Sequence, residues 1–292
     1  MTLEDTSLSK KIFYDSWQNN FFKFSVIFFV FICLFAFIYP EISAIKAEKM
    51  NIKSKFLPPI FFEGFSWTHI LGTDQLGRDM LMRCLVGLRF SLIIGFASVL
   101  IMLLFGCLIG VISGFKSSWV DVIIMRITDA QLSIPMVILA ISILGVSRPN
   151  LASIILVLAL SGWPLYARVS RSMALIERDK EYVRGARILG ANDFRIIFFL
   201  VIPIILPPIA FVSVLDIARM MIFEAILGFL GLGVQPPTPT FGNIIADARK
   251  YLINAWWIAT MPGIFLVITL VTLNFIGSTL EKSKNKIFGE GI

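Results

Sequence analysis

The uncharged stretch from Phe90 to Ser113, FSLIIGFASVLIMLLFGCLIGVIS, decides what kind of fold this chain adopts. A single α-helix needs about 20 predominantly apolar residues to cross the hydrocarbon core of a bilayer. The stretch from Phe90 to Ser113 exceeds that length and contains no charged side chain. It therefore predicts a transmembrane helix.

Composition extends this prediction to the whole chain. Of its 292 residues, 57% are hydrophobic and 15% are charged, whereas a soluble domain carries about 25% charged residues. A soluble protein of this composition would have too little polar surface to cover itself, and contact with lipid removes that difficulty. The net charge is +7. Because the basic residues lie in loops between apolar runs, this charge favours anionic lipid headgroups over nucleic acid as a partner.

Five further apolar runs are long enough for a crossing, and together they predict an all-α integral membrane protein with six transmembrane helices. The predicted spans are about 21–39, 90–113, 121–146, 151–166, 196–215 and 255–280. The first is interpreted as a retained anchor, because it is long for a signal peptide and lacks an A-x-A-like site before Pro40. The chain then divides into the anchor and an extracytoplasmic loop, 1–86, and a core with the other five predicted spans, 87–292.

A seventh uncharged stretch, 225–246, is not predicted to cross. A helix exposed to lipid could not satisfy its backbone through Pro236-Pro237-Thr238-Pro239. Residues 224–250 are therefore interpreted as a re-entrant or outer loop near a gate. Its candidate residues are Glu224, Gly231, Gly233, Pro236 and Pro237. Six crossings place both termini on the same side, and the Lys/Arg bias of the loops favours the cytoplasm.

The polar loop 167–195, between the fourth and fifth spans, contains the pattern of a short amphipathic helix. One face consists of Tyr182, Val183, Ala186 and Leu189 or Gly190. Gly190 is suited to end that helix, and Asn192 or Asp193 to cap the next one. Small residues on the apolar face predict close approach by the groove of a partner. The alternative is a solvated loop helix whose basic charge only sets topology.

The spacing Gly185-Ala186-x3-Gly190-x9-Leu200-x-Ile202-Pro203 resembles the "EAA" loop of binding-protein-dependent ABC transporter permeases. In that family the loop is a coupling helix that docks in a groove of the cytoplasmic ATPase. Arg184 replaces the family's acid and Gly185 its first alanine, while Glu181 offers an acid one turn earlier. The resemblance implies an ATPase-coupling site of Glu181, Tyr182, Arg184, Gly185, Ala186, Arg187, Leu189, Gly190 and Pro203.

Three more segments narrow the resemblance to the C-type permease of dipeptide, oligopeptide and nickel transporters. They are His69-x-Leu71-Gly72-Thr73-Asp74-x2-Gly77-Arg78-Asp79, Arg126-x2-Asp129-x5-Pro135, and the run from Phe229 to Pro239. The resemblance implies the type I importer fold with a cytoplasmic coupling helix, in the cytoplasmic (inner) membrane of a bacterium. It also implies a homologous second permease, two cytoplasmic ATPase subunits that hold ATP and Mg²⁺, and an extracytoplasmic binding protein. Short peptides are the implied cargo, with nickel chelates as the alternative.

Two polar groups remain outside the coupling helix. Thr73, Asp74, Gly77, Arg78 and Asp79 are interpreted as a structural network at the outer mouth, because no nucleophile–base pair accompanies them. Arg126 and Asp129 have the i,i+3 spacing of a helical pair inside the third span. They are a candidate intramembrane pair on a transport path, and an interface ion pair is the alternative.

Enzymatic activity is not expected in this chain. It has no G-x4-G-K-[ST] phosphate loop, so ATP hydrolysis is assigned to partner subunits. His69 is its only histidine, and Cys33, Cys84 and Cys107 have no metal or redox spacing, so neither a metal nor another cofactor is predicted. An intramembrane enzyme would need facing catalytic groups. An ion-driven secondary transporter would show an inverted repeat.

Overall fold

The computed structural model describes residues 8–116, 119–146 and 149–289. These residues form helices and loops, with one isolated bridge between Thr73 and Asp79. The helices are α1 (Leu8–Trp17), α2 (Asn20–Ile42), η2 (Ile52–Ser54), α3 (Met80–Lys116), α4 (Trp119–Leu132), α5 (Met136–Leu144), α6 (Leu151–Glu177), α7 (Glu181–Ile188), α8 (Asp193–Ile196), η3 (Ile197–Val201), α9 (Ile202–Phe229), α10 (Phe241–Ala248), η4 (Arg249–Tyr251) and α11 (Trp257–Gly289).

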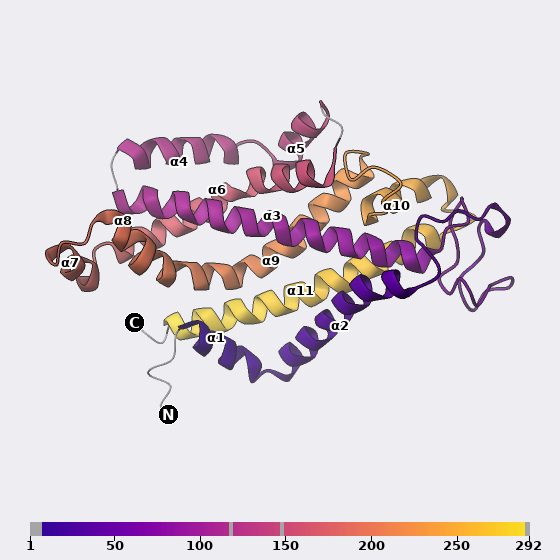
Figure 1. Cartoon of the computed structure of the whole chain (residues 1–292), viewed down its shortest axis with the longest axis horizontal. Helices are drawn as coiled ribbons and strands as arrows, with labels where there is room; N and C mark the ends of the chain where they lie inside the picture. The colour runs from indigo at the N-terminus through magenta and orange to yellow at the C-terminus, as the bar shows by residue number, and fades with distance from the viewer. Residues whose placement is uncertain (1–7, 117–118, 147–148, 290–292) are drawn as a thin grey trace.

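The long helices run between two ends of an elongated bundle (Figure 1). One end, called here the α7 end, carries α7 and α8 together with α1 and the last turns of α11. The other, the α10 end, carries α10 and the loop 43–79. At the α7 end, Lys286 Nζ donates to Asp15 Oδ1 over 2.8 Å, and Ser16 Oγ donates to Ser283 Oγ over 2.9 Å. The first and last described helices therefore meet at one end, and the terminal residues themselves lie outside the described part.

Five helices are long and apolar enough to cross a membrane, and a bent helix pair raises the number to six if it counts as one span. The five are α2, α3, α6, α9 with the residues before it from Asp193, and α11. The predicted third span, 121–146, is not one straight helix: α4 and α5 meet at 85°. Pro135 caps α5 there. Its ring removes a backbone donor and restricts the preceding residue, so the helix breaks.

Several helices extend beyond the predicted spans. α6 continues to Glu177 rather than ending near residue 166, and α9 continues to Phe229 rather than residue 215. Hydropathy marks where a chain leaves the hydrocarbon, whereas a helix ends only where its backbone bonds end. The predicted loops 167–195 and 224–250 are consequently too long. Glu224 belongs to α9, and α10 occupies most of the last third of the predicted outer loop.

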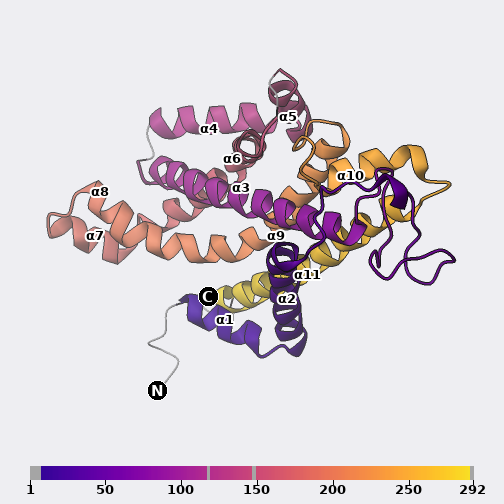
Figure 2. The ribbon, with the colours of Figure 1, turned by 45° about the vertical axis from the view of Figure 1, so that its right-hand side comes forward.

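Tight contact between α3 and α6 organises the core. Gly106, Gly110 and Gly114 repeat every four residues on α3, and a Cβ at each would overlap with α6 atoms. Small residues at this spacing let two helix backbones approach closely, which is how helices associate in lipid. The main apolar cluster lies among α3, α6 and α9. α4 and α5 lie on one side of this layer, and α2 and α11 on the other (Figure 2).

Candidate functional site

The helix α7 forms as its sequence predicts, and Gly190 ends it. Gly190 has φ +85°, a left-handed conformation that suits glycine. Its N–H donates to the Arg187 carbonyl over 3.0 Å, and the Ala191 N–H donates to the Ala186 carbonyl over 3.0 Å. These two bonds are a Schellman motif, which satisfies carbonyls that the helix end would leave free. The prediction that Gly190 terminates α7 is confirmed.

The predicted partner face of α7 is split between the bundle and the surface. Val183 is fully buried and the partly buried Ala186 packs against the bundle's own core, so this part of the predicted face meets the same chain. Ile188 is 86% exposed and Leu189 is 89% exposed. The exposed residues of this segment are Glu181, Tyr182, Arg184, Arg187, Ile188, Leu189 and Gly190, and Ile188 and Leu189 are its most exposed apolar side chains. Helical periodicity identifies an apolar face, but it does not say whether that face meets the same chain or another one.

Contacts to α6 and α3 hold α7 rigidly. Glu177, at the end of α6, accepts from Tyr182 Oη over 2.7 Å and from Lys180 Nζ over 2.8 Å. Burial, followed by this bond to the Glu177 carboxylate, raises the pKa of the Tyr182 phenol. The Arg187 guanidinium lies 5.0 Å from the centre of the Phe115 ring on α3, a cation–π contact. These contacts connect α7 to both long helices.

After α7, the chain starts a new helix, α8, and a groove lies beside this connection. The Asn192 side chain accepts from the Arg195 N–H over 2.9 Å, which confirms the predicted cap. A cavity of about 520 Å³ is lined by Ala186, Leu189, Gly190, Ala191, Arg195, Ile196, Phe199 and Leu200. Pro203 is not among its lining residues. It lies in the first turn of α9, directly after the π-helical turn Ile197–Val201, so it shapes the start of α9.

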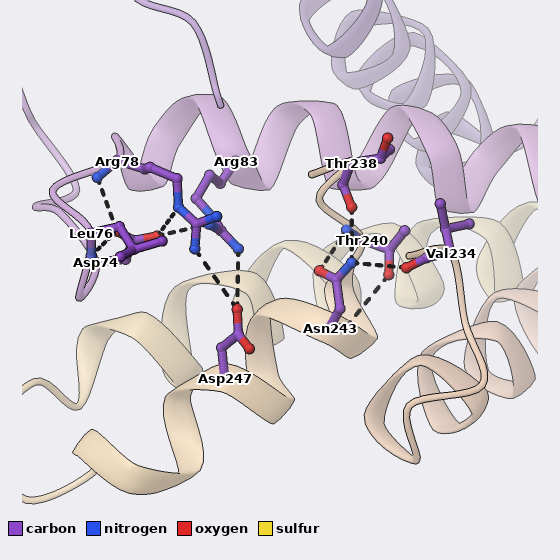
Figure 3. A network of polar contacts seen from close by, with 9 residues as sticks. All are labelled: Asp74, Leu76, Arg78, Arg83, Val234, Thr238, Thr240, Asn243 and Asp247. Carbon is purple, nitrogen blue, oxygen red and sulfur yellow. Dashed lines mark hydrogen bonds and ion pairs between the residues drawn. The ribbon is translucent and has the colours of Figure 1, made fainter. Parts of the chain in front are cut away.

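At the α10 end, the predicted network around Asp74 assembles (Figure 3). Asp74 Oδ2 accepts from Arg78 Nε over 2.6 Å and from Arg83 Nη1 over 2.7 Å. Its Oδ1 accepts the N–H groups of Leu76 and Arg78 over 2.8 and 2.9 Å. Both arginines also approach Asp247 of α10, at 3.8 and 3.7 Å. Four N–H donors from three residues stabilise one buried carboxylate, and the network fastens α10 to the start of α3.

Asp79 and Thr73 complete this network. Asp79 caps α3 by accepting the Met82 N–H over 2.8 Å, and its second oxygen lies 2.8 Å from His69 Nδ1. Thr73 Oγ1 accepts from the Leu57 N–H over 2.9 Å. Gly77 has φ +71°, and a side chain there would overlap with the carbonyl of residue 51.

Sequence reasoning missed the contribution of Asp247 to this network. That residue lies in a stretch that was interpreted as loop, and its partners are far away along the chain. Only the capping pattern Thr240-x2-Asn243, which starts α10, could have indicated a helix there.

The predicted outer loop packs against the bundle as a cap. Asn243 Nδ2 donates to the Val234 and Thr238 carbonyls over 3.2 and 2.9 Å (Figure 3). Glu224 is fully buried and accepts from Ser91 Oγ of α3 over 2.6 Å. The Asn243 bonds connect the cap to α10, and the Ser91–Glu224 bond connects α3 to α9.

Glycines and prolines shape the same cap. Gly231 has φ +82° and ends α9, and Gly233 packs so closely on Gly228 that a Cβ would overlap. Pro236 and Pro237 follow in the connection to α10.

Arg126 and Asp129 are not the ion pair that their spacing allows. Asp129 Oδ1 instead accepts from Arg168 Nη2 of α6 over 2.6 Å. Spacing along one helix permits a pair, but a neighbouring helix offers a competing partner. Across the described residues, no three His, Cys, Asp or Glu side chains gather as metal ligands.

The comparisons with known proteins agree with this geometry. The family described as "Binding-protein-dependent transport system inner membrane component" matches residues 106–284. The Di/tripeptide transport system permease protein DppC of Pseudomonas aeruginosa is 34% identical over 272 residues, which cover 93% of this chain and 90% of that protein. The Dipeptide transport system permease protein DppC of Haemophilus influenzae is 33% identical, covering 90% of each chain.

Two further comparisons extend this result. The Probable D,D-dipeptide transport system permease protein DdpC of Escherichia coli is 33% identical over 88% of this chain and 84% of its own length. Among solved structures, an inward-facing MetNI methionine ABC transporter aligns with a TM-score of 0.57. It covers 70% of this chain and 97% of its own at 19% identity, which supports the fold alone.

Proposed function

Because the chain belongs to the family of binding-protein-dependent transport system inner membrane components, and is a permease of an ABC importer, we propose that it carries short peptides into a bacterium. The relatives that match nearly the whole chain are named as dipeptide or di/tripeptide permeases. The structural observation that supports ATP-driven import is α7: an exposed Ile188–Leu189 tip, held by α6 and α3, at one end of the bundle.

The α7 end faces the cytoplasm in this proposal. Two ATPase subunits bind there and hold ATP and Mg²⁺, and one of them receives Arg184, Ile188 and Leu189. An extracytoplasmic binding protein docks at the α10 end, and a homologous second permease completes the path. The exposed apolar tip of α7 supports an ATPase contact, because two adjacent side chains above 85% exposure have no partner surface in the described residues.

Coupling follows from the way α7 is held. Closure of the ATPase dimer displaces α7. Because Glu177 and Phe115 anchor α7 to α6 and α3, the displacement moves both helices as a rigid pair. The close glycine packing of α3 on α6 prevents the pair from absorbing the motion internally.

Reconstitution of the complete importer in proteoliposomes tests this function. We expect ATP hydrolysis stimulated by the loaded binding protein, together with uptake of a dipeptide. Stimulation and uptake with a nickel chelate alone would show that the cargo assignment is wrong. Uptake by this chain alone, without ATP and driven by an ion gradient, would overturn the importer assignment itself.

A further inference from the structure

A charge pair at membrane depth, Asp216 with Arg219 on α9, has no role in coupling or in the α10-end network. Asp216 Oδ1 lies 3.0 Å from Arg219 Nη1, and its Oδ2 accepts from Tyr166 Oη of α6 over 2.7 Å. The Asp216 side chain is 8% exposed, whereas that of Arg219 is 55% exposed. The carboxylate is thus enclosed between two helices, and the guanidinium projects outward.

The pair lies within the hydrocarbon layer rather than at its edge. Tyr166 packs against Gly106, which is well inside the uncharged stretch 90–113. Arg219 lies three residues beyond Asp216 in the direction of the α10 end, which is about 4.5 Å further along the helix. An arginine exposed at this depth does not face lipid, because such residues face a bundle interior, a water-filled path or a partner. This face of α9 therefore borders the path or the second permease.

A cavity of about 390 Å³ adjoins the pair. α6 contributes Leu165, Tyr166, Val169 and Met173, α9 contributes Pro208, Ile209, Val212, Ser213 and Asp216, and the end of α11 contributes Lys284 and Asn285. Arg219 continues the α9 stripe of Val212 and Asp216 by one helical turn. The cavity is mostly apolar. Its polar groups are Tyr166, Ser213 and Asp216, with Lys284 and Asn285 at the α7 end.

We propose that Arg219 binds the terminal carboxylate of the peptide during its passage, with Asp216 and Tyr166 as positioning residues. This inference rests on the proposed function. Both oxygens of Asp216 already have donors, so that carboxylate orients the arginine rather than binding cargo. Within the described part of the chain, the guanidinium has no second ion pair. A guanidinium has five N–H donors, and those not directed at Asp216 suit a bidentate carboxylate.

Recognition of a terminus explains how one permease could pass peptides of different sequence. The terminal carboxylate is common to all of them, and the apolar wall beside it accepts varied side chains without specific hydrogen bonds. A carboxylate on the partner permease could pair with Arg219 by the same chemistry. The test therefore distinguishes an ion pair between the two permeases from binding of the peptide.

The test uses the complete reconstituted importer and the dipeptide Ala-Ala, whose only anionic group is its terminal carboxylate. Three properties are measured for each variant: co-purification of the second permease, ATPase stimulation by loaded binding protein, and Ala-Ala uptake. We expect Arg219→Gln to keep the first two and to lower uptake about tenfold or more. Arg168→Gln is the matched control. It also removes an arginine paired with an aspartate, but its partner Asp129 does not line the cavity, whereas Asp216, the partner of Arg219, does, so it should lower uptake far less.

The double variant Asp216→Asn with Arg219→Gln separates binding from charge balance. It leaves no unpaired charge at membrane depth, so it should insert even if Arg219→Gln alone does not, and its uptake should be equally low. Uptake at the wild-type level in either variant would overturn the proposal, and so would loss of the second permease from a variant that inserts normally. A wild-type importer that moves no peptide would overturn the proposed function, and this inference with it.

Discussion

Replacing Gly190 by alanine tests whether the end of α7 transmits force. Gly190 has φ +85°, and nothing lies within 4 Å of the position its Cβ would occupy, so the penalty is one of backbone conformation and not of space. An L-residue in the left-handed region costs roughly 1–2 kcal/mol. The two Schellman bonds at Gly190 contribute about 1 kcal/mol each. The conformational cost of alanine is thus comparable to the stabilisation that the two Schellman bonds provide. The end of α7 should therefore fray in a substantial fraction of molecules.

Fraying would release Ile188 and Leu189 from their positions while Val183 and the long helices remain in place. We therefore expect Gly190→Ala to insert normally and to lower uptake and stimulated ATPase activity about tenfold, because 1.4 kcal/mol corresponds to a factor of ten. Gly185→Ala is the matched control. It makes the same chemical change five residues earlier, where φ is not positive and nothing lies within 4 Å. Alanine there favours the helix by about 0.5–1 kcal/mol, so coupling should be kept.

The assay compares both variants in proteoliposomes at equal insertion, with basal and stimulated ATPase activity measured together. Gly190→Asn should be milder than Gly190→Ala, since asparagine enters the left-handed region more readily. Equal coupling in the Gly190→Ala and Gly185→Ala proteins would refute the reasoning, because only the backbone conformation distinguishes the two sites.

Three further substitutions probe packing, charge and docking. Gly110→Ile would drive a branched side chain into the α6 backbone, so we expect the thermal midpoint to fall well below that of Gly263→Ile, where space is open; similar midpoints would argue against the α3–α6 contact. Asp74→Asn leaves buried arginines without their main counter-charge and should destabilise the protein by about 3–5 kcal/mol in denaturant unfolding; an unchanged unfolding curve would contradict the network. Leu189→Asp should leave stability unchanged and abolish co-purification of the ATPase, whereas Val183→Asp should destabilise the chain itself; retained ATPase in the Leu189→Asp complex would remove α7 from the docking surface.

The sequence alone predicted the features that depend on neighbouring residues along the chain. Long uncharged stretches identify helices that cross lipid, because only a helix satisfies its own backbone there. The existence of α7, its end at Gly190 and the cap at Asn192 follow from local hydrogen bonding. The clustering of Asp74 and Arg78 was likewise indicated by their closeness in sequence.

Tertiary structure decided every question that required a second segment of the chain. It determined that Val183 faces inward and Leu189 outward, that Asp129 pairs with Arg168, and that Asp247 reaches the arginines of α3. It also determined the bend of 85° between α4 and α5 and the enclosure of Asp216 beside an exposed Arg219. Hydropathy and helical period describe one element at a time. The partner of a charge, or the side of a helix that remains free, depends on distances between elements, and these exist only once the helices have packed.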